Sequence, residues 1–110
     1  MGSVPEQGDV YRIALEGIGH EERGPHYAVV ASDEAYNQGS TIVVIPFSSH
    51  AREATVHPAT VINGTRTKAM VEQLRAVDKS RLREHICSIA GDTTMSLILE
   101  QLTYLFALDQ

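Results

Sequence analysis

The sequence predicts a mainly β fold (α+β), a small and strongly bent sheet or barrel completed by one C-terminal helix. Before Gly91, short β-branched or alternating runs are separated by Gly, Pro and Asn turn signals. After Gly91 the apolar residues take on a helical period. With 110 residues and 43% hydrophobic content, the chain can build one compact core, so we expect a single domain over residues 1–110.

The first half of the chain contains three expected strands. Residues 9–15 alternate in polarity, which is typical of a strand with one buried face. Residues 27–31 and 41–45 are compact Val- and Ile-rich runs, so we expect them in the centre of the sheet. The third strand should stop at Pro46, because proline cannot donate a hydrogen bond to a ladder.

The next part of the chain predicts a hairpin and a final strand. Residues 54–62 could form a strand, which Pro58 would place at an edge or a bulge. Asn63-Gly64 is a dipeptide that joins hairpins, and the partner strand is expected over residues 68–77. Asp78 should cap a short turn, and a last strand is expected over residues 85–90.

The last element is expected to be a helix over residues 93–108, with Asp92 as its N-cap. Its apolar stripe is too wide for one face of an exposed helix. The stripe consists of Met95, Leu97, Ile98, Leu99, Leu102, Leu105 and Phe106. We therefore expect the sheet, a second subunit, or both to cover it.

Composition and charge exclude several classes of function. The net charge of -5 argues against broad binding to a nucleic-acid duplex, although a small basic groove stays open. The sequence shows neither a signal peptide nor an apolar run of membrane-spanning length, so we expect a soluble, cytoplasmic protein without membrane attachment. Cys87 is the single cysteine and is expected to be a buried strand residue. No metal or cofactor is expected, because metal-ligand spacing is absent, although five histidines could still meet in space.

Five motifs follow one another in the order of a known family. They are Gly8-Asp9-Val10-Tyr11, Gly19-His20-Glu21-Glu22, Ala28-Val29-Val30, Val44-Ile45-Pro46-Phe47-Ser48-Ser49, and the segment from Glu72 to Leu82. Together they make the chain, from about Gly8 to Leu108, resemble the MazF/PemK/Kid family of toxin endoribonucleases. The resemblance implies an SH3-like barrel of the CcdB/PemK type, a homodimer, and sequence-specific, metal-independent cleavage of single-stranded mRNA. It also implies a cognate antitoxin that occupies the RNA groove.

RNA cleavage without a metal uses the 2′-hydroxyl beside the scissile phosphate as the nucleophile. Such an enzyme needs a base for the 2′-hydroxyl proton, an acid for the 5′-oxygen, and donors for the phosphate oxygens. The expected products carry a 2′,3′-cyclic phosphate and a 5′-hydroxyl.

The acid is expected where the family has a Gly-x-Arg-Pro pattern at the end of the first loop. This chain has Gly24-Pro25-His26-Tyr27 there. His26 therefore stands in place of the arginine that, by the resemblance, acts on the scissile phosphate. Imidazole can serve as a general acid near neutral pH, but it lacks the permanent charge and the bidentate grip of guanidinium. Arg23 could swing in as a substrate-binding residue and restore the positive charge.

The resemblance also assigns roles to residues in two further motifs. Ser48 falls where the family has Thr or Ser, and a hydroxyl at a strand end can donate to a phosphate oxygen; Ser49 beside it is expected to bind substrate. His20 and Glu21 match a His-Glu pair of Kid-type members. Either could act as the base or hold His26 in its productive tautomer.

A third assignment concerns the segment that begins at Glu72. Glu72 aligns with a general base of Kid-like members, although the arginine that assists it two residues earlier is Met70 here. Gln73 and Arg75 are expected to position the RNA, and Arg75 is expected to be mainly structural.

Two classes of function stay open at this point. The first is an active endoribonuclease. The second is a non-catalytic binding module on the same fold, either a degenerate toxin or a gyrase-directed toxin of the CcdB kind. Gyrase-directed relatives act through the end of the C-terminal helix, which Leu108-Asp109-Gln110 does not resemble. The loop charges favour the nuclease.

Overall fold

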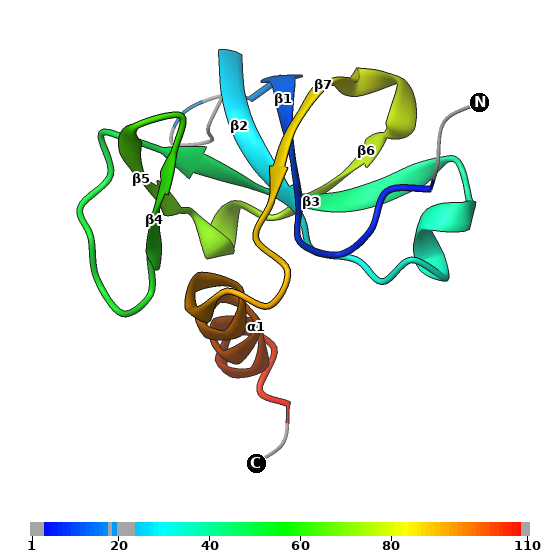
Figure 1. Cartoon of the computed structure of the whole chain (residues 1–110). Coiled ribbons are helices and arrows are strands. Elements are labelled where there is room, and N and C mark those ends of the chain that lie inside the picture. Colours follow the sequence, from blue (N-terminus) through cyan, green and yellow to red (C-terminus); the bar gives the residue numbers. More distant parts are fainter. Residues whose placement is uncertain (1–3, 18, 20–23, 109–110) are drawn as a thin grey trace.

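The computed structural model describes residues 4–17, 19 and 24–108. These residues form one antiparallel sheet and one α-helix (Figure 1). The strands are β1 (Asp9–Leu15), β2 (Gly24–Val30), β3 (Thr41–Ser48), β4 (Ala59–Ile62), β5 (Thr65–Ala69), β6 (Arg75–Asp78) and β7 (Leu82–Ser88), and the helix is α1 (Thr93–Leu105). Single 3₁₀ turns η1 (Tyr36–Gln38), η2 (Val71–Gln73) and η3 (Lys79–Arg81) connect them.

The long strand β3 organises the sheet. The strand order is β4-β5-β3-β2-β1-β7, with β6 also paired to β3. Along one edge β3 pairs with β2, while along the other it pairs first with β6 and then, at its end, with β5. One strand therefore carries two separate neighbours on the same side, which confirms the expected strongly bent sheet with a C-terminal helix.

The expected stop at Pro46 is wrong, because β3 continues to Ser48. Pro46 stands between the part of β3 that pairs with β6 and the part that pairs with β5. Its carbonyl accepts a hydrogen bond from the Met70 backbone N–H at 2.9 Å. The N–H and C=O of a strand residue point to the same side, so the N–H that proline lacks would face this gap and not the β2 ladder.

The single strand expected over residues 68–77 is also wrong. The partner of β4 is β5, which begins directly after the Asn63-Gly64 turn, where both residues have positive φ (49° and 80°). The chain then turns through η2, with Val71 buried, before it enters β6. This break is required because β5 and β6 pair with different parts of β3.

Several boundaries differ from expectation, while the turn at Asp78 is confirmed. The Asp78 side chain accepts a hydrogen bond from the Ser80 backbone N–H at 2.8 Å and so caps η3. The last strand is Leu82–Ser88 rather than residues 85–90. The helix ends at Leu105, before Ala107 adopts a left-handed φ of 55°. Asp92 holds the N-cap position without a capping side-chain hydrogen bond.

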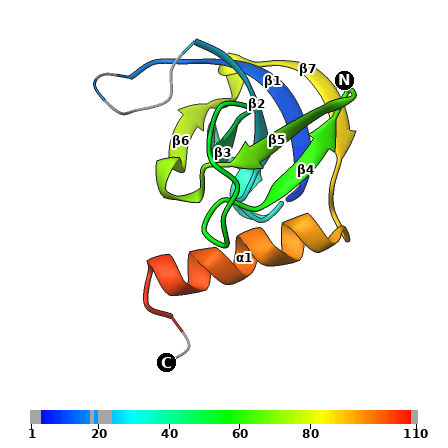
Figure 2. The same ribbon diagram turned by 90° about the vertical axis from the view of Figure 1, so that its left-hand side faces the viewer.

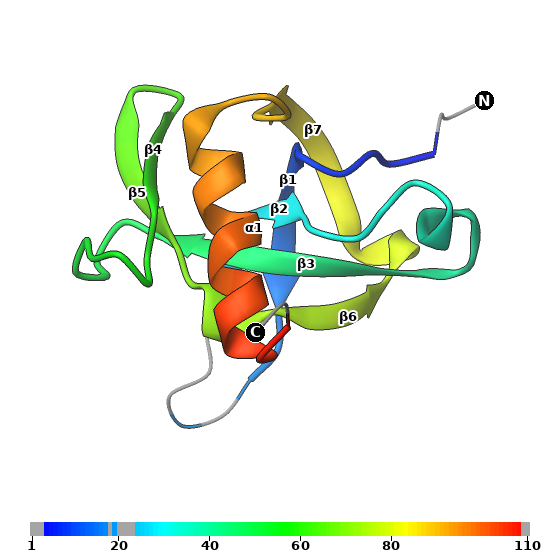
Figure 3. The same ribbon diagram turned by 90° about the horizontal axis from the view of Figure 1, so that it is seen from below.

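The helix covers one of two buried clusters between the curled strands. Figure 2 shows α1 below the strands, and Figure 3, seen from below, shows α1 crossing β3 beside the β4–β5 hairpin. Met95 and Ile98 are buried there against residues such as Phe47, and burial of one such side chain contributes roughly 1.5–3 kcal/mol. The Thr94 hydroxyl donates to the Ala59 carbonyl at 2.9 Å and so ties the helix to β4.

Leu102 is partly buried against the same cluster, whereas other large apolar side chains of α1 and of the residues after it stay exposed in the single chain. Leu97, Leu99, Tyr104, Leu105 and Phe106 are all exposed, mostly towards the C-terminal end of α1. None of the helices in the described residues is both long and apolar enough to span a membrane.

Candidate functional site

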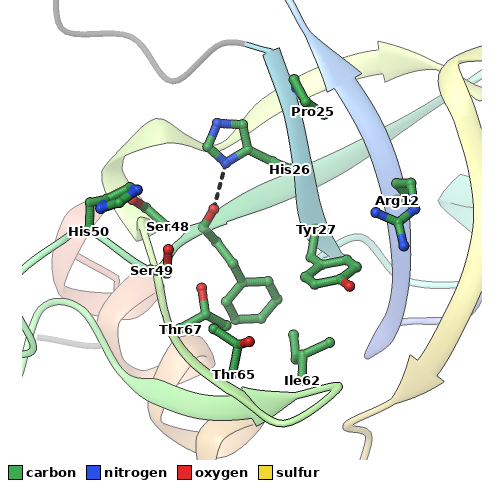
Figure 4. A pocket seen from close by; sticks show the side chains of 11 residues that line it. Arg12, Pro25, His26, Tyr27, Ser48, Ser49, His50, Ile62, Thr65 and Thr67 are labelled. Carbon is green, nitrogen blue, oxygen red and sulfur yellow. Dashed lines mark hydrogen bonds between the residues drawn. The ribbon is translucent and has the colours of Figure 1, made fainter.

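A pocket of about 370 Å³ lies where β1, β2, the end of β3 and the β4–β5 hairpin meet (Figure 4). Strand ends from distant parts of the chain supply its walls. The pocket is lined by Arg12, Pro25, His26, Tyr27, Phe47, Ser48, Ser49, His50, Ile62, Thr65 and Thr67. Its mixture of basic, hydroxyl and aromatic side chains suits a ligand that carries both a negative charge and flat apolar surface.

His26 stands at the point where β2 separates from β3. Backbone pairing of these strands ends at Ala28 and Pro46. Beyond that pair, the His26 side chain makes a hydrogen bond between the two strands, with its Nδ1 2.7 Å from the Phe47 carbonyl oxygen. A carbonyl oxygen can only accept, so Nδ1 must carry the proton whether the ring is neutral or charged. The nitrogen that gains and loses a proton is therefore Nε2.

Ser48 and its two successors form the neighbouring wall. Ser48 stands two residues beyond the last β2–β3 pair, as His26 does on the other strand, and its side chain is buried. Ser49 and His50 follow it and are exposed. The Lys68 ammonium donates to the Ser49 carbonyl at 3.0 Å, which fixes this loop and places a positive charge beside it.

The opposite wall is built on β1 and β2. Arg12 lies across the strand pair from Tyr27, and its guanidinium carbon is 5.1 Å from the centre of the tyrosine ring. The Asn63 amide donates to the Tyr27 hydroxyl at 3.1 Å. A ring held by a cation on one side and a hydrogen bond at its tip offers a rigid surface for a planar group such as a nucleobase.

Of the residues predicted from sequence, the structure brings His26, Ser48 and Ser49 together in this pocket. His20, Glu21 and Arg23 lie outside the residues that the structure describes.

Glu72 lies elsewhere. Its carboxylate oxygens are 3.0 and 3.1 Å from the His57 Nε2, and it lines a second hollow of about 220 Å³ beside the end of α1. Glu72 does not line the pocket that holds His26 and Ser48. Because η2 interrupts the expected strand at this residue, the chain directs Glu72 towards the helix instead.

Arg75 and Gln73 also lie outside the pocket. The Arg75 guanidinium donates to the Glu16 carbonyl at 2.7 Å and to the Gln73 side-chain oxygen at 3.3 Å. These contacts tie the start of β6 to the end of β1 and support the expected structural part of the Arg75 role.

Several pocket residues received no role from the sequence, among them the basic side chains Arg12 and His50. Arg12 occupies one of the polar positions of the alternating β1 pattern. A charged residue at such a position usually indicates an ordinary solvated side chain. His50 follows the two serines at the end of β3. The proximity of a titratable ring to a strand-end serine is the signal that could have identified it.

Outside the pocket, burial and hydrogen bonding shift the pKa values of several described ionisable groups. Burial raises the pKa of Tyr11 and of the Cys87 thiol. Hydrogen bonds from Ser80 lower the pKa of Asp78. Among residues 4–17, 19 and 24–108, no group of three or more His, Cys, Asp or Glu side chains is arranged to hold a metal ion.

Sequence comparison assigns the chain to a family. Residues 6–106 match the family described as "PemK-like, MazF-like toxin of type II toxin-antitoxin system". The chain belongs to this family, which confirms the resemblance seen in its motifs. A candidate toxin of Mycobacterium tuberculosis H37Rv, Rv3098A, is 37% identical over 73 residues, which is 64% of this chain and 68% of the relative.

Solved structures share the fold. MazF from Deinococcus radiodurans superimposes with a TM-score of 0.82 at 21% identity, covering 97% of this chain and 100% of that one. An endoribonuclease from a mycobacterial species, solved with its cognate antitoxin, gives 0.76 at 17% identity with 99% of both chains covered. The Mycobacterium tuberculosis toxin MazF-mt6 gives 0.75 at 10% identity, covering 93% and 99%. These likenesses confirm the expected fold.

Proposed function

We propose that this chain is the endoribonuclease toxin of a toxin–antitoxin pair. It cleaves single-stranded mRNA at a specific sequence, without a metal, and leaves 2′,3′-cyclic phosphate and 5′-hydroxyl ends. The observation that carries the proposal is the His26 ring, fixed through Nδ1 to the Phe47 carbonyl in a pocket that also contains Ser48.

The proposed chemistry follows from this arrangement. The scissile phosphate lies between His26 and Ser48, and the neighbouring 2′-hydroxyl attacks phosphorus. Protonated His26 gives the Nε2 proton to the departing 5′-oxygen, while the Ser48 hydroxyl donates to a non-bridging oxygen. Because Ser48 is a buried strand-end residue, its hydroxyl is positioned before substrate binds.

Positive charge comes from residues other than the arginine expected in the family pattern. Arg12 lines the pocket on β1, and Lys68 holds the Ser49 carbonyl at the opposite wall. Two cations flanking the pocket can attract an RNA backbone to a chain whose net charge is -5. The Tyr27 ring beside Arg12 supplies a surface on which an unpaired base stacks.

The proposed partners are single-stranded RNA, a cognate antitoxin and a second copy of the chain. MazF from Deinococcus radiodurans was solved together with MazE, and a mycobacterial endoribonuclease was solved with its antitoxin. The exposed apolar end of α1 provides surface for a protein contact. Cleavage of mRNA places the action of the toxin in the cytoplasm.

The proposal is tested by incubating purified, antitoxin-free protein with a long single-stranded RNA in EDTA and mapping the cut sites and their ends. His26→Asn is the informative variant, because the asparagine amide can still donate to the Phe47 carbonyl but cannot transfer a proton. We expect recurrent cuts with cyclic phosphate ends, and a loss of about 10²-fold or more in His26→Asn, the usual scale for a lost general acid.

A matched control is His85→Gln, which removes a histidine that lies on β7, outside the pocket. It should cut like the wild type. Absence of cutting by the folded wild-type protein would refute the proposal and direct attention to a non-catalytic partner-binding role.

A further inference from the structure

We infer that His50 is the general base of the proposed cleavage and that it works with His26 as an acid–base pair. This inference rests on the proposed function, since the nuclease reaction needs one group to take the 2′-hydroxyl proton and another to protonate the 5′-oxygen.

The pocket offers few groups that can exchange a proton near neutral pH. Its described ionisable side chains are Arg12, His26, Tyr27 and His50. Guanidinium and phenol groups keep their protons at neutral pH, whereas imidazole can both take and give one. Two histidines in one pocket therefore meet the two requirements of the reaction.

The surroundings of the two rings divide the roles. The Phe47 carbonyl accepts the Nδ1 proton of His26, a contact that suits a ring which carries a positive charge before it acts as an acid. His50 is exposed on the loop after β3, where a neutral ring can take a proton and return it to water. His50 therefore fits the base and His26 the acid.

The loop holds His50 beside the reacting phosphate. In Figure 4, His50 and His26 lie at the same end of the pocket with Ser48 beside them, and Arg12 lies at the other end. Ser48 pairs with Lys68 on β5, and the Lys68 ammonium donates to the Ser49 carbonyl. Two anchors thus fix the backbone immediately before His50.

Glu72, one of the two carboxylates that the sequence offered as a base, is engaged elsewhere. Glu72 contacts the His57 ring at 3.0 Å beside the end of α1, away from the pocket residues. His20 and Glu21, the other residues that the sequence offered as a base, lie outside the described residues. Among the described residues, the placement of Glu72 leaves the base to a residue of the pocket.

Neutral His50 takes the proton of the 2′-hydroxyl as the 2′-oxygen forms its bond to phosphorus. The bond from phosphorus to the 5′-oxygen breaks, and that oxygen takes the Nε2 proton of His26. His50 ends protonated and His26 ends neutral, and exchange with water restores both rings.

The test combines a pH profile with a modified RNA. The rate of single-turnover cleavage by the wild type should follow a bell-shaped curve against pH, because the base must be neutral and the acid charged. Arg12, Tyr27 and Lys68 are the other charged or ionisable groups of this region. His50→Gln should lose about 10²-fold and the acidic limb of the bell. His26→Asn should lose the alkaline limb.

The modified RNA carries sulfur in place of the 5′-oxygen at the mapped cut. A thiolate leaves without protonation, so this substrate should restore His26→Asn but not His50→Gln. His85→Gln serves as the control, and thermal melting verifies that each variant folds.

If His50→Gln cuts like the wild type at every pH, or is restored by the sulfur-containing RNA, His50 is not the base. In that case cutting by the wild type still upholds the proposed function. If the wild type does not cut at all, the proposed function and this inference both fail.

Discussion

Gly8, in the first of the family motifs, is a position where a single added methyl group should damage the fold. Its backbone N–H donates to the Val30 carbonyl and its own carbonyl accepts from the Ile89 N–H, both at 2.9 Å. Gly8 has a φ of +99°, and an added Cβ would stand 2.8 Å from the N, Cα and Cβ atoms of Ala90. The two hydrogen bonds hold the backbone in place, so Gly8→Ala cannot relieve this contact cheaply.

The expected loss can be separated into two parts by comparison with Gly64. Gly64 also has a positive φ, +80°, but an added Cβ there would meet nothing within 4 Å. Gly64→Ala should therefore cost only the left-handed backbone term, about 1–2 kcal/mol. Gly8→Ala adds an overpacking term of about 1–3 kcal/mol, for a total of roughly 2–5 kcal/mol out of a typical stability of about 5–15 kcal/mol.

The assay is urea unfolding of both variants and the wild type at one protein concentration, because association changes apparent stability. The free energy of unfolding should fall in the order wild type, Gly64→Ala, Gly8→Ala. Equal losses in the two variants would show that the contact with Ala90 does not constrain the fold.

Three further predictions concern other side chains. His26→Arg should lower RNA cleavage, because a guanidinium does not release its proton near neutral pH; an increase would show that phosphate charge, and not proton transfer, limits the rate. The Cys87 thiol should react with iodoacetamide more slowly at pH 8 in the folded than in the urea-unfolded protein, because burial raises its pKa. Reaction at equal rates would contradict this. Asp78→Asn should reduce stability most above pH ~4, the ordinary pKa range of an aspartate. Hydrogen bonds from Ser80 lower the pKa of Asp78 in the folded protein, so the stabilisation is lost as the pH falls through this lowered pKa. A stability difference that grows on acidification would oppose the assignment.

Local patterns predicted the elements whose causes are local. The alternation over residues 9–15 matches β1, and Asn63-Gly64 forms the expected hairpin turn because both residues adopt positive φ. The Asp78 cap depends on a side chain reaching its own neighbouring backbone, so a short sequence window contains all the information needed.

The wrong predictions arose where a strand changes partners. Pro46 was expected to end β3 because proline breaks a ladder, yet its missing N–H faces a gap between two partner strands. Residues 68–77 read as one strand for the same reason, since nothing in that window shows that β5 and β6 pair with separate parts of β3. Such information is held by the tertiary pairing and not by the local sequence.

Only part of the candidate site could be predicted from the sequence. His26 and Ser48 stand in recognisable family motifs, and the structure places both in one pocket. Arg12 and His50 reach the same pocket only because β1 pairs with β2 in a particular register and because the loop after β3 is held by Lys68. Neither register nor loop anchoring can be derived from spacing alone.

In the proposed mechanism, the 2′-hydroxyl attacks a phosphate held between His26 and Ser48. The most direct measurement compares, in EDTA, an RNA oligonucleotide that contains the mapped cut site with the same oligonucleotide carrying a single 2′-deoxy residue before the scissile phosphate. We expect the first oligonucleotide to be cut to a 2′,3′-cyclic phosphate and the second to be left intact. Cleavage of the 2′-deoxy substrate at that phosphate would show that the 2′-hydroxyl is not the nucleophile.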